Sequence, residues 1–224
     1  MTSVGNSTWR VIVPVKERDH AKTRLRPPTG IDRSQLAMAF ALDTLSAVFD
    51  VVAASGVFVV TDDQGVAGFV ADRGGNTVRD PGRGLNPAIA AGLNAASDAD
   101  LMSDQPCHPS RPCHPGAVLL GDVPCLTPAD LTAALRACAV AESCVVPDAD
   151  GTGTVLLTHH DLRRIVPRFG AGSAARHSRC AATLPLDLPR LRTDVDNEAA
   201  FEQARVLGVG PHTSALLGAA TSVS

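Results

Sequence analysis

The sequence has few aromatic residues and no excess of positive charge. Among its 224 residues there are one Trp, no Tyr and six Phe. Because single-stranded nucleic acids stack their bases on aromatic side chains, this scarcity argues against a nucleic-acid ligand. The formal net charge of -3 gives no overall positive field that would attract a polyanion. We therefore expect no nucleic-acid partner.

Long hydrophobic runs and a leader pattern are also missing. The most apolar window, VVAASGVFVV, is about half the length that a membrane-spanning helix needs. The N-terminal stretch MTSVGNSTWR lacks a basic segment followed by an apolar one. The six Cys are scattered, unlike the disulfide framework of a small secreted domain. We expect a cytoplasmic protein with no membrane partner.

The common glycine motifs for nucleotide phosphates are absent as well. No stretch matches G-x-x-x-x-G-K-[ST], and neither the GLN nor the GTGT segment completes G-x-G-x-x-G. The first apolar run is followed by lysines instead of the glycine fingerprint of dinucleotide-binding folds. A nicotinamide-dependent oxidoreductase is therefore disfavoured.

What the sequence does contain is a regular alternation of short β-branched runs and amphipathic segments. Helix start signals occur at Asp32 with Gln35, at Thr127 before Pro128, and at Asn197. The segment VVPDADGTGTVLLT leaves no room for a helix and predicts a hairpin. The pattern predicts a three-layer α/β fold around a mixed, mainly parallel sheet. The predicted strands are residues 11–15, 57–60, 76–79, 117–120, 144–147, 154–158 and 191–195.

We expect a single domain over residues 10–212, with tails at 1–9 and 213–224. Residues 103–116 repeat Pro-Cys-His-Pro and form a predicted insertion loop. A metal clip is one interpretation of this repeat, but adjacent Cys-His pairs match none of the usual zinc spacings. We favour a Pro-rich surface insertion. The four residues of the alternative clip are Cys107, His108, Cys113 and His114.

A basic loop follows the first predicted strand, in the stretch VKERDHAKTRL. It carries Lys16, Lys22 and Arg24, in a chain that is slightly acidic overall. In open α/β sheets ligands bind at the carboxyl ends of the strands, where this loop begins. A solvated surface is the alternative, but a nucleoside triphosphate needs cations along its phosphates.

Carboxylates follow two other predicted strands, Asp122 in GDVP and Asp194 and Asp196 in DVDN. Each is equally consistent with a turn or a helix entry when taken alone. Mg²⁺, however, prefers one or two carboxylates together with phosphate oxygens and water. Asp122 with Asp194 or Asp196 meets that demand, so we expect a Mg²⁺ cofactor.

A second candidate anion site lies in PRFGAGSAARHSR. Gly170 and Gly172 form a flexible turn, and Ser173 is a candidate helix cap followed by Arg176 and His177. Free N–H groups at a helix start bind phosphate or carboxylate. An ordinary capped helix with a basic face is the alternative. Two anion sites in one small domain indicate a phosphorylated acceptor facing a nucleotide.

These segments, in this order, resemble the phosphoenolpyruvate / 2-phospho-L-lactate guanylyltransferase family of coenzyme F420 biosynthesis. The specific motifs are K-x5-K-T-R-L and RFG-x-x-S-x-x-RH, whereas GD-x-P and D-x-D occur in nucleotidyltransferases generally. The resemblance implies a Rossmann-like nucleotidyltransferase fold. It also implies transfer of GMP from GTP to a small phosphorylated three-carbon acid, with release of pyrophosphate.

The resemblance assigns a role to each candidate residue. Lys16, Lys22 and Arg24 would hold the triphosphate and act in catalysis, and Leu85 and Asn86 would help to seat the nucleoside. Asp122 with Asp194 or Asp196 would bind Mg²⁺. The positions matching the family's phosphoenolpyruvate contacts are Thr154, Gly170 and Ser173.

Two alternatives to this function stay open. The acceptor is either phosphoenolpyruvate or 2-phospho-L-lactate. The Ala- and Arg-rich, Lys-poor composition is typical of actinobacteria, where the family's phosphoenolpyruvate-using members occur, and it favours the first acid. A non-catalytic nucleotide-binding subunit would need a broken metal site, yet all three Asp are present. The next enzyme of the pathway is an expected partner for product hand-over.

Overall fold

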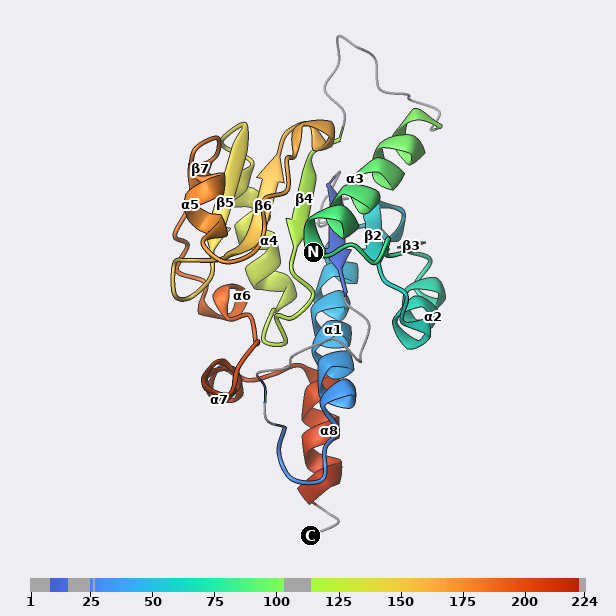
Figure 1. The fold of residues 1–224 in the computed structure, drawn as a ribbon, viewed down its shortest axis with the longest axis vertical. Coiled ribbons are helices and arrows are strands. Elements are labelled where there is room, and N and C mark those ends of the chain that lie inside the picture. The colour runs from blue at the N-terminus through green and yellow to red at the C-terminus, as the bar shows by residue number, and fades with distance from the viewer. Residues whose placement is uncertain (1–8, 16–24, 26, 103–113, 222–224) are drawn as a thin grey trace, which may run out of the picture.

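Seven strands form one mixed sheet in the order β3-β2-β1-β4-β6-β5-β7 (Figure 1). The computed structural model describes residues 9–15, 25, 27–102 and 114–221. Strands β1 to β4 run parallel, whereas β6 is antiparallel to both β4 and β5. The predicted hairpin and the mixed, mainly parallel sheet are confirmed. The strands are β1 (Arg10–Pro14), β2 (Val57–Val60), β3 (Asn76–Val78), β4 (Gly116–Leu119), β5 (Ser143–Pro147), β6 (Thr154–His159) and β7 (Ala182–Thr183).

The helices begin where the capping residues predict. The Asp32 side chain accepts from the backbone of Ser34 while the Gln35 side chain accepts from Asp32 N, and the Thr127 and Asn197 side chains each accept from one first-turn N–H of α4 and α7. The helices are α1 (Arg33–Phe49), α2 (Gln64–Asp72), α3 (Leu85–Leu101), α4 (Pro128–Cys138), α5 (Ser173–His177), α6 (Pro189–Arg192), α7 (Glu198–Leu207) and α8 (Pro211–Thr221). Two 3₁₀ turns are η2 (Ala54–Gly56) and η3 (Leu162–Arg164).

Alternating strand residues face two separate cores, which makes the fold three-layered. In β1, Val11 and Val13 pack with α1, α2 and α4 on one side, while Ile12 packs with α3 and η3 on the other. Helix α3 lies close to the sheet because Gly92 has no Cβ; a Cβ there would lie 2.6 Å from the Ile12 side chain. The predicted three-layer architecture is therefore confirmed.

A third core lies below the carboxyl edge of the sheet, where α8 runs alongside α1 (Figure 1). It joins Phe40 of α1, Phe201 of α7 and the fully buried Leu25 and Val195. The Phe40 and Phe201 ring centroids are 5.6 Å apart. Leu25 follows the basic loop in the sequence, and Val195 separates the two candidate metal ligands, so this core fixes the residue next to each candidate segment.

A buried carboxylate of α1 anchors α8. Asp43, which is 3% exposed, accepts hydrogen bonds from the backbone N–H groups of His212 (2.8 Å) and Thr213 (3.0 Å). These are first-turn N–H groups, which have no partner within their own helix. Burial raises the pKa of the Asp43 carboxyl, an effect that the hydrogen bonds from α8 oppose.

Three parts of the structure differ from the sequence prediction. The strand predicted at 191–195 is wrong, because Pro189 starts the short helix α6. Burial still alternates from Leu191 to Val195, since the segment lies against the core without joining the sheet. Strand β7 was not predicted, and most of the predicted tail at 213–224 is helix α8.

The predicted insertion loop has a buried ion pair at its base. Asp100, fully buried near the end of α3, lies 2.7 Å from the Arg10 guanidinium and 3.0 Å from His114 Nδ1. His114 is therefore engaged with a carboxylate, whereas Cys107, His108 and Cys113 lie outside the described residues.

None of the helices within the described ranges combines the length and apolar character needed to cross a bilayer.

Candidate active site

The centre of the site is the turn that follows β4, residues 121–124. Gly121 packs so tightly on the end of β1 that a Cβ there would lie 2.9 Å from the Pro14 carbonyl oxygen. Asp122 therefore lies beside the point where the chain leaves β1 for the basic loop. Lys16, Lys22 and Arg24 themselves lie outside the described residues.

Hydrogen bonds from three different segments fix this turn. Val195 N donates to the Asp122 carbonyl (2.9 Å), Val123 N donates to the buried Thr44 hydroxyl of α1 (3.0 Å), and Gly210 N donates to the Pro124 carbonyl (2.8 Å). The Asp122 Oδ1 atom is itself buried. The carboxylate is thus carried on a main chain with little freedom to move.

The structure brings the main chain of the segment that carries both other candidate carboxylates next to that of Asp122. Asp194 and Asp196 flank Val195, whose N–H is bonded to the Asp122 carbonyl. Asp194 is half-buried, whereas Asp196 is exposed and accepts a hydrogen bond from Asn197 Nδ2 (2.9 Å). In the part of the chain that the structure describes, no group of three or more His, Cys, Asp or Glu side chains could hold a metal. A cation bound here would therefore need further oxygen ligands, supplied by a bound substrate and by water.

The donor types at this turn fit Mg²⁺. Asp122, Asp194 and Asp196 offer carboxylate oxygens, which are hard ligands. Asp122 comes from one segment and the other two from a second, and a backbone hydrogen bond joins the two segments. The buried Oδ1 of Asp122 lies at the edge of the sheet where ligands of open α/β folds bind.

The Gly-rich turn before α3 lies at the same edge. Gly82 and Gly84 have φ values of 69° and 98°, which only glycine adopts without strain. Leu85, the first residue of α3, is half-buried against the core that α3 shares with the sheet. Asn86 has a partner that the sequence did not predict: its Nδ2 donates to the Phe169 carbonyl (3.1 Å) and its Oδ1 accepts from Phe169 N (2.7 Å). The Asn86 amide thus joins the α3 turn to the 168–172 loop.

The three predicted acceptor residues lie around the start of β6. Thr154 and Ser173 are 2% and 1% exposed, whereas Gly170 is exposed, with a φ of 114°. The hairpin and α5 are joined by the hydrogen bond from Ala174 N to the Thr152 carbonyl (3.1 Å). Because β6 runs antiparallel to β4, its first residue, Thr154, lies at the same sheet edge as Asp122.

Ser173 is the first residue of α5 and not its cap, which corrects the sequence prediction. Gly172, in the left-handed conformation, precedes the helix. Ser173 N already donates to the Gly170 carbonyl (3.0 Å), and Ala174 N donates to the hairpin. These two N–H groups are therefore occupied within the chain, so an anion at this turn would need other donors, such as the Ser173 hydroxyl.

Comparison with known proteins decides the family. The sequence profile of the MobA-like NTP transferase domain matches residues 35–182. A phosphoenolpyruvate guanylyltransferase of Geodermatophilus obscurus is 44% identical, with 95% of each chain covered. Enzymes of the same name from Salinispora arenicola and Streptomyces coelicolor are each 40% identical, covering 95% and 93% of this chain and 94% and 95% of theirs. This chain belongs to the phosphoenolpyruvate guanylyltransferase family.

Solved structures place the guanylyltransferase fold among wider nucleotidyltransferases. A cytidylyltransferase of Leptospira borgpetersenii superposes with a TM-score of 0.54 at 10% identity, covering 97% of this chain and 95% of that one. A 4-diphosphocytidyl-2C-methyl-D-erythritol synthase of Anaerococcus prevotii gives 0.50 at 12% identity, covering 89% and 98%. At these identities the likeness shows a shared fold, and the predicted Rossmann-like nucleotidyltransferase fold is confirmed.

One residue of the guanylyltransferase motif RFG-x-x-S-x-x-RH behaves differently from its sequence interpretation. His177, expected on a basic helix face, is 4% exposed and lies 2.9 Å from the Thr154 hydroxyl through Nδ1. Its Nε2 accepts a hydrogen bond from Arg168 N (3.0 Å). Burial, together with the nearby cations of Arg176 and Arg168, lowers the pKa of His177 to about 4. The imidazole is therefore neutral near pH 7.

One guanidinium donates three of the hydrogen bonds that hold the 168–172 loop. Arg176 donates to the carbonyls of Arg168 (3.1 Å), Gly170 (3.2 Å) and Ala171 (2.6 Å). The cation is directed at its own loop, so its main role in the described structure is to shape the segment that carries Gly170. The positive charge of Arg176 in the sequence does not by itself reveal that the side chain bonds to carbonyls of its own loop.

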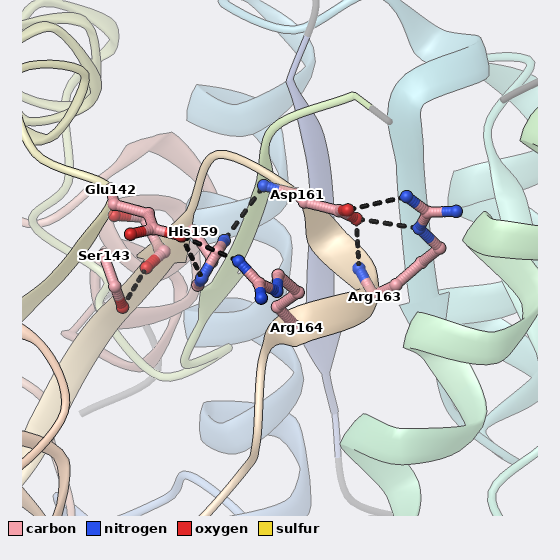
Figure 2. A network of polar contacts seen from close by, with 7 residues as sticks. Glu142, Ser143, His159, Asp161, Arg163 and Arg164 are labelled. Carbon is pink, nitrogen blue, oxygen red and sulfur yellow. Dashed lines mark hydrogen bonds and ion pairs between the residues drawn. The ribbon is translucent and has the colours of Figure 1, made fainter. Parts of the chain in front are cut away.

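A second polar network lies at the far end of β6 and is separate from the site. Figure 2 shows Arg163 facing Asp161 (2.6 Å) and Arg164 facing Glu142 (2.9 Å) around His159. The hydrogen bonds from Arg163 lower the pKa of Asp161, and burial lowers the pKa of His159. These charges are paired with one another, and the network holds η3 against the β5–β6 hairpin.

Proposed function

We propose that this chain transfers GMP from GTP to phosphoenolpyruvate. The product would be enolpyruvyl-2-diphospho-5'-guanosine, with pyrophosphate as the leaving group. The observation that carries the proposal is the meeting, at one sheet edge, of Asp122 and the DVDN segment with Thr154, Gly170 and Ser173. Family membership supplies the identity of the two substrates. The cytoplasm, where GTP is available, is the compartment that the proposal requires.

The reaction needs no nucleophilic side chain. An oxygen of the acceptor phosphate attacks the α-phosphorus of GTP, the bond to the β-phosphate oxygen breaks, and pyrophosphate leaves with that electron pair. The chain's own contribution is to position the two substrates in line and to balance their negative charge. Lys16, Lys22 and Arg24 are proposed to bind the triphosphate, and Leu85 and Asn86 are proposed to border the nucleoside.

Mg²⁺ is part of the proposal. Asp122 with Asp194 or Asp196 would hold it, and when bound the ion neutralises charge on the α-phosphate and on the leaving pyrophosphate. The turn fixed by Thr44, Val195 and Gly210 would keep the Asp122 carboxylate in place. Thr154, Gly170 and Ser173 would bind the acceptor acid from the opposite half of the site.

The proposal also places the enzyme in coenzyme F420 biosynthesis, where the resemblance puts it. A phosphoanhydride between GMP and an enol phosphate is an activated compound. Hand-over to the enzyme that consumes it would protect the product from hydrolysis.

The test is pyrophosphate release from the purified protein with GTP and Mg²⁺. Phosphoenolpyruvate and 2-phospho-L-lactate are offered in parallel, with ATP and CTP as nucleotide controls. Release with GTP and phosphoenolpyruvate alone is the expected outcome. Release only with 2-phospho-L-lactate would move the proposal to the other acid, and silence with both acids would contradict it.

A further inference from the structure

We propose that His177 is a positioning residue that turns the Thr154 hydroxyl into a hydrogen-bond donor for the acceptor acid. This inference rests on the proposed function, because it concerns how the acceptor half of that site recognises an anion. It assigns to the buried imidazole the task of fixing where the hydroxyl hydrogen of Thr154 points.

The argument starts with the hydrogen on each atom. A backbone N–H can only donate, so the bond from Arg168 N to His177 Nε2 (3.0 Å) requires an unprotonated Nε2. In a neutral imidazole the hydrogen is then on Nδ1. Nδ1 lies 2.9 Å from Thr154 Oγ1, so the imidazole donates and the threonine oxygen accepts. The hydroxyl hydrogen of Thr154 is left to point elsewhere.

The surroundings keep the ring neutral and still. The cationic groups around it are Arg168 and Arg176, whose charges disfavour a protonated imidazole, and burial acts in the same direction. The Phe169 ring meets the imidazole edge-on, with centroids 5.0 Å apart, and Phe169 is in turn fixed by the Asn86 amide. The tautomer is therefore set by the fold and does not depend on the substrate.

The hydrogen of Thr154 matters because the expected ligand is an anion. Phosphate and carboxylate oxygens accept hydrogen bonds, so a hydroxyl that presented its lone pairs to them would be repelled. With Nδ1–H already at Oγ1, the favourable arrangement directs the O–H toward the ligand. Thr154 belongs to the hairpin that Ala174 N and His177 join to α5, so the O–H donor is placed in the proposed acceptor half of the site.

A matched pair of variants separates the two hydrogen bonds of the imidazole. His177→Asn places an amide N–H near the position of Nδ1, whereas His177→Gln places an amide oxygen near the position of Nε2 and removes the donor to Thr154. We expect His177→Gln to raise the KM for phosphoenolpyruvate about tenfold to a hundredfold, as expected for a lost bond to an anion. The KM for GTP should change less than about twofold. His177→Asn should recover most of the loss.

A double-mutant cycle tests whether His177 acts through Thr154. In a Thr154→Val background, His177→Gln should add less than about twofold to the KM for phosphoenolpyruvate. Equal effects in both backgrounds, or a parallel rise in the KM for GTP, would overturn the positioning role. Circular dichroism melting identifies any variant that does not fold.

A second measurement is independent of turnover. Long-range ¹H–¹⁵N spectra of the ¹⁵N-histidine-labelled protein report which ring nitrogen carries hydrogen. Protonated Nδ1 and bare Nε2 at pH 7 are expected for His177, and hydrogen on Nε2 would overturn the inference whether or not the enzyme turns over. A wild-type protein without activity but with this tautomer would instead count against the proposed function alone.

Discussion

At the scale of single residues, the chain's two lysines are its sharpest functional signal. Lys16 and Lys22 are the only lysines among 224 residues, and both occur in the loop that follows β1. Arg supplies every other permanent side-chain cation. A lysine ammonium binds phosphate as a compact point charge on a flexible stem. It can therefore stay in contact with a triphosphate while the nucleotide is aligned with its acceptor.

Replacing Lys22 with Ala should lower kcat/KM for GTP about 100- to 1,000-fold. The reason is that the negative charge on the leaving pyrophosphate would no longer be stabilised by the Lys22 ammonium. Steady-state pyrophosphate release measures the change. Arg136→Ala, which removes an exposed cation from α4, is the charge-matched control and should stay near wild type. Near-normal turnover of the Lys22 variant with an intact fold would refute the assignment of the loop.

The three carboxylates near β4 should differ in importance. Asp122→Asn and Asp194→Asn are each expected to lower turnover by two to three orders of magnitude, roughly the effect of losing one charge-stabilising group. Asp196→Asn should cost less, because Asp196 is exposed and already accepts from Asn197. Titration of activity with Mg²⁺ measures both effects, and equal losses at Asp194 and Asp196 would contradict the ranking.

The neutral His177 should make stability depend on pH. Its pKa is about 4 in the folded chain and near 6.5 when unfolded, so between these values the unfolded chain binds more protons. The free energy of unfolding should therefore fall as the pH drops from 6.5 to 4, by at most about 3 kcal/mol from this group. Urea titrations at pH 7 and pH 4.5 measure it.

His177→Asn should remove that part of the pH dependence. His160→Asn, at an exposed histidine, is the control and should leave the difference between the two pH values unchanged. An unchanged difference in the His177 variant would show that folding does not lower the pKa of His177.

Sequence reasoning placed the candidate residues in the fold better than it explained their contacts. The positions of Asp122 after a strand and of Thr154 in the hairpin follow from apolar runs and turns, which are local, whereas the proposed role of Thr154 comes from the family resemblance alone. The pairing of Asn86 with Phe169 spans 83 positions, and no local pattern predicts an amide that bonds to a distant main chain. The sequence did not reveal that His177 is neutral, because its charge depends on burial and burial depends on the tertiary structure.

At the scale of elements, helices were predicted correctly wherever the sequence has both hydrophobic periodicity and a capping residue. Helix α1 has a capping box and an apolar stripe, and it begins at the predicted residue. The segment 191–195 has the alternating burial of a strand but begins with a helical turn that Pro189 starts. Arg192 then donates to the carbonyls of Pro147 (3.1 Å) and Asp148 (2.8 Å) at the hairpin, a contact that the local pattern does not reveal.

The attachment of α8 to α1 should depend on one carboxylate. Asp43→Asn removes an acceptor and leaves a buried N–H of His212 or Thr213 without its partner, so the free energy of unfolding should drop by about 1–3 kcal/mol. Chemical denaturation monitored by circular dichroism measures the loss. Asp50→Asn, beyond the end of α1 and exposed, is the control. Equal stability of the two variants would refute the anchoring role.

At the scale of the whole molecule, the third core links stability to function. Phe40, Phe201 and the apolar side of α8 pack with Leu25, which follows the basic loop, and with Val195, which lies within the DVDN segment. Asp43→Asn, which should weaken the attachment of α8, tests whether this core only supports the site. Loss of GTP turnover in the Asp43 variant should follow the fraction unfolded, and not exceed it, if this core acts only as a support.

The reversed direction of β6 has a consequence for how such enzymes diversify. The proposed triphosphate half of the site follows the ends of β1 and β4, whereas the proposed acceptor half is one uninterrupted stretch, from the hairpin tip at 148–153 through α5. That stretch includes β6, which pairs with β4, and its 168–172 loop is joined to α3 by the Asn86 amide. Because the proposed acceptor half is contiguous in the sequence, we expect substitutions confined to it to change the choice of acid while leaving the choice of nucleotide unchanged.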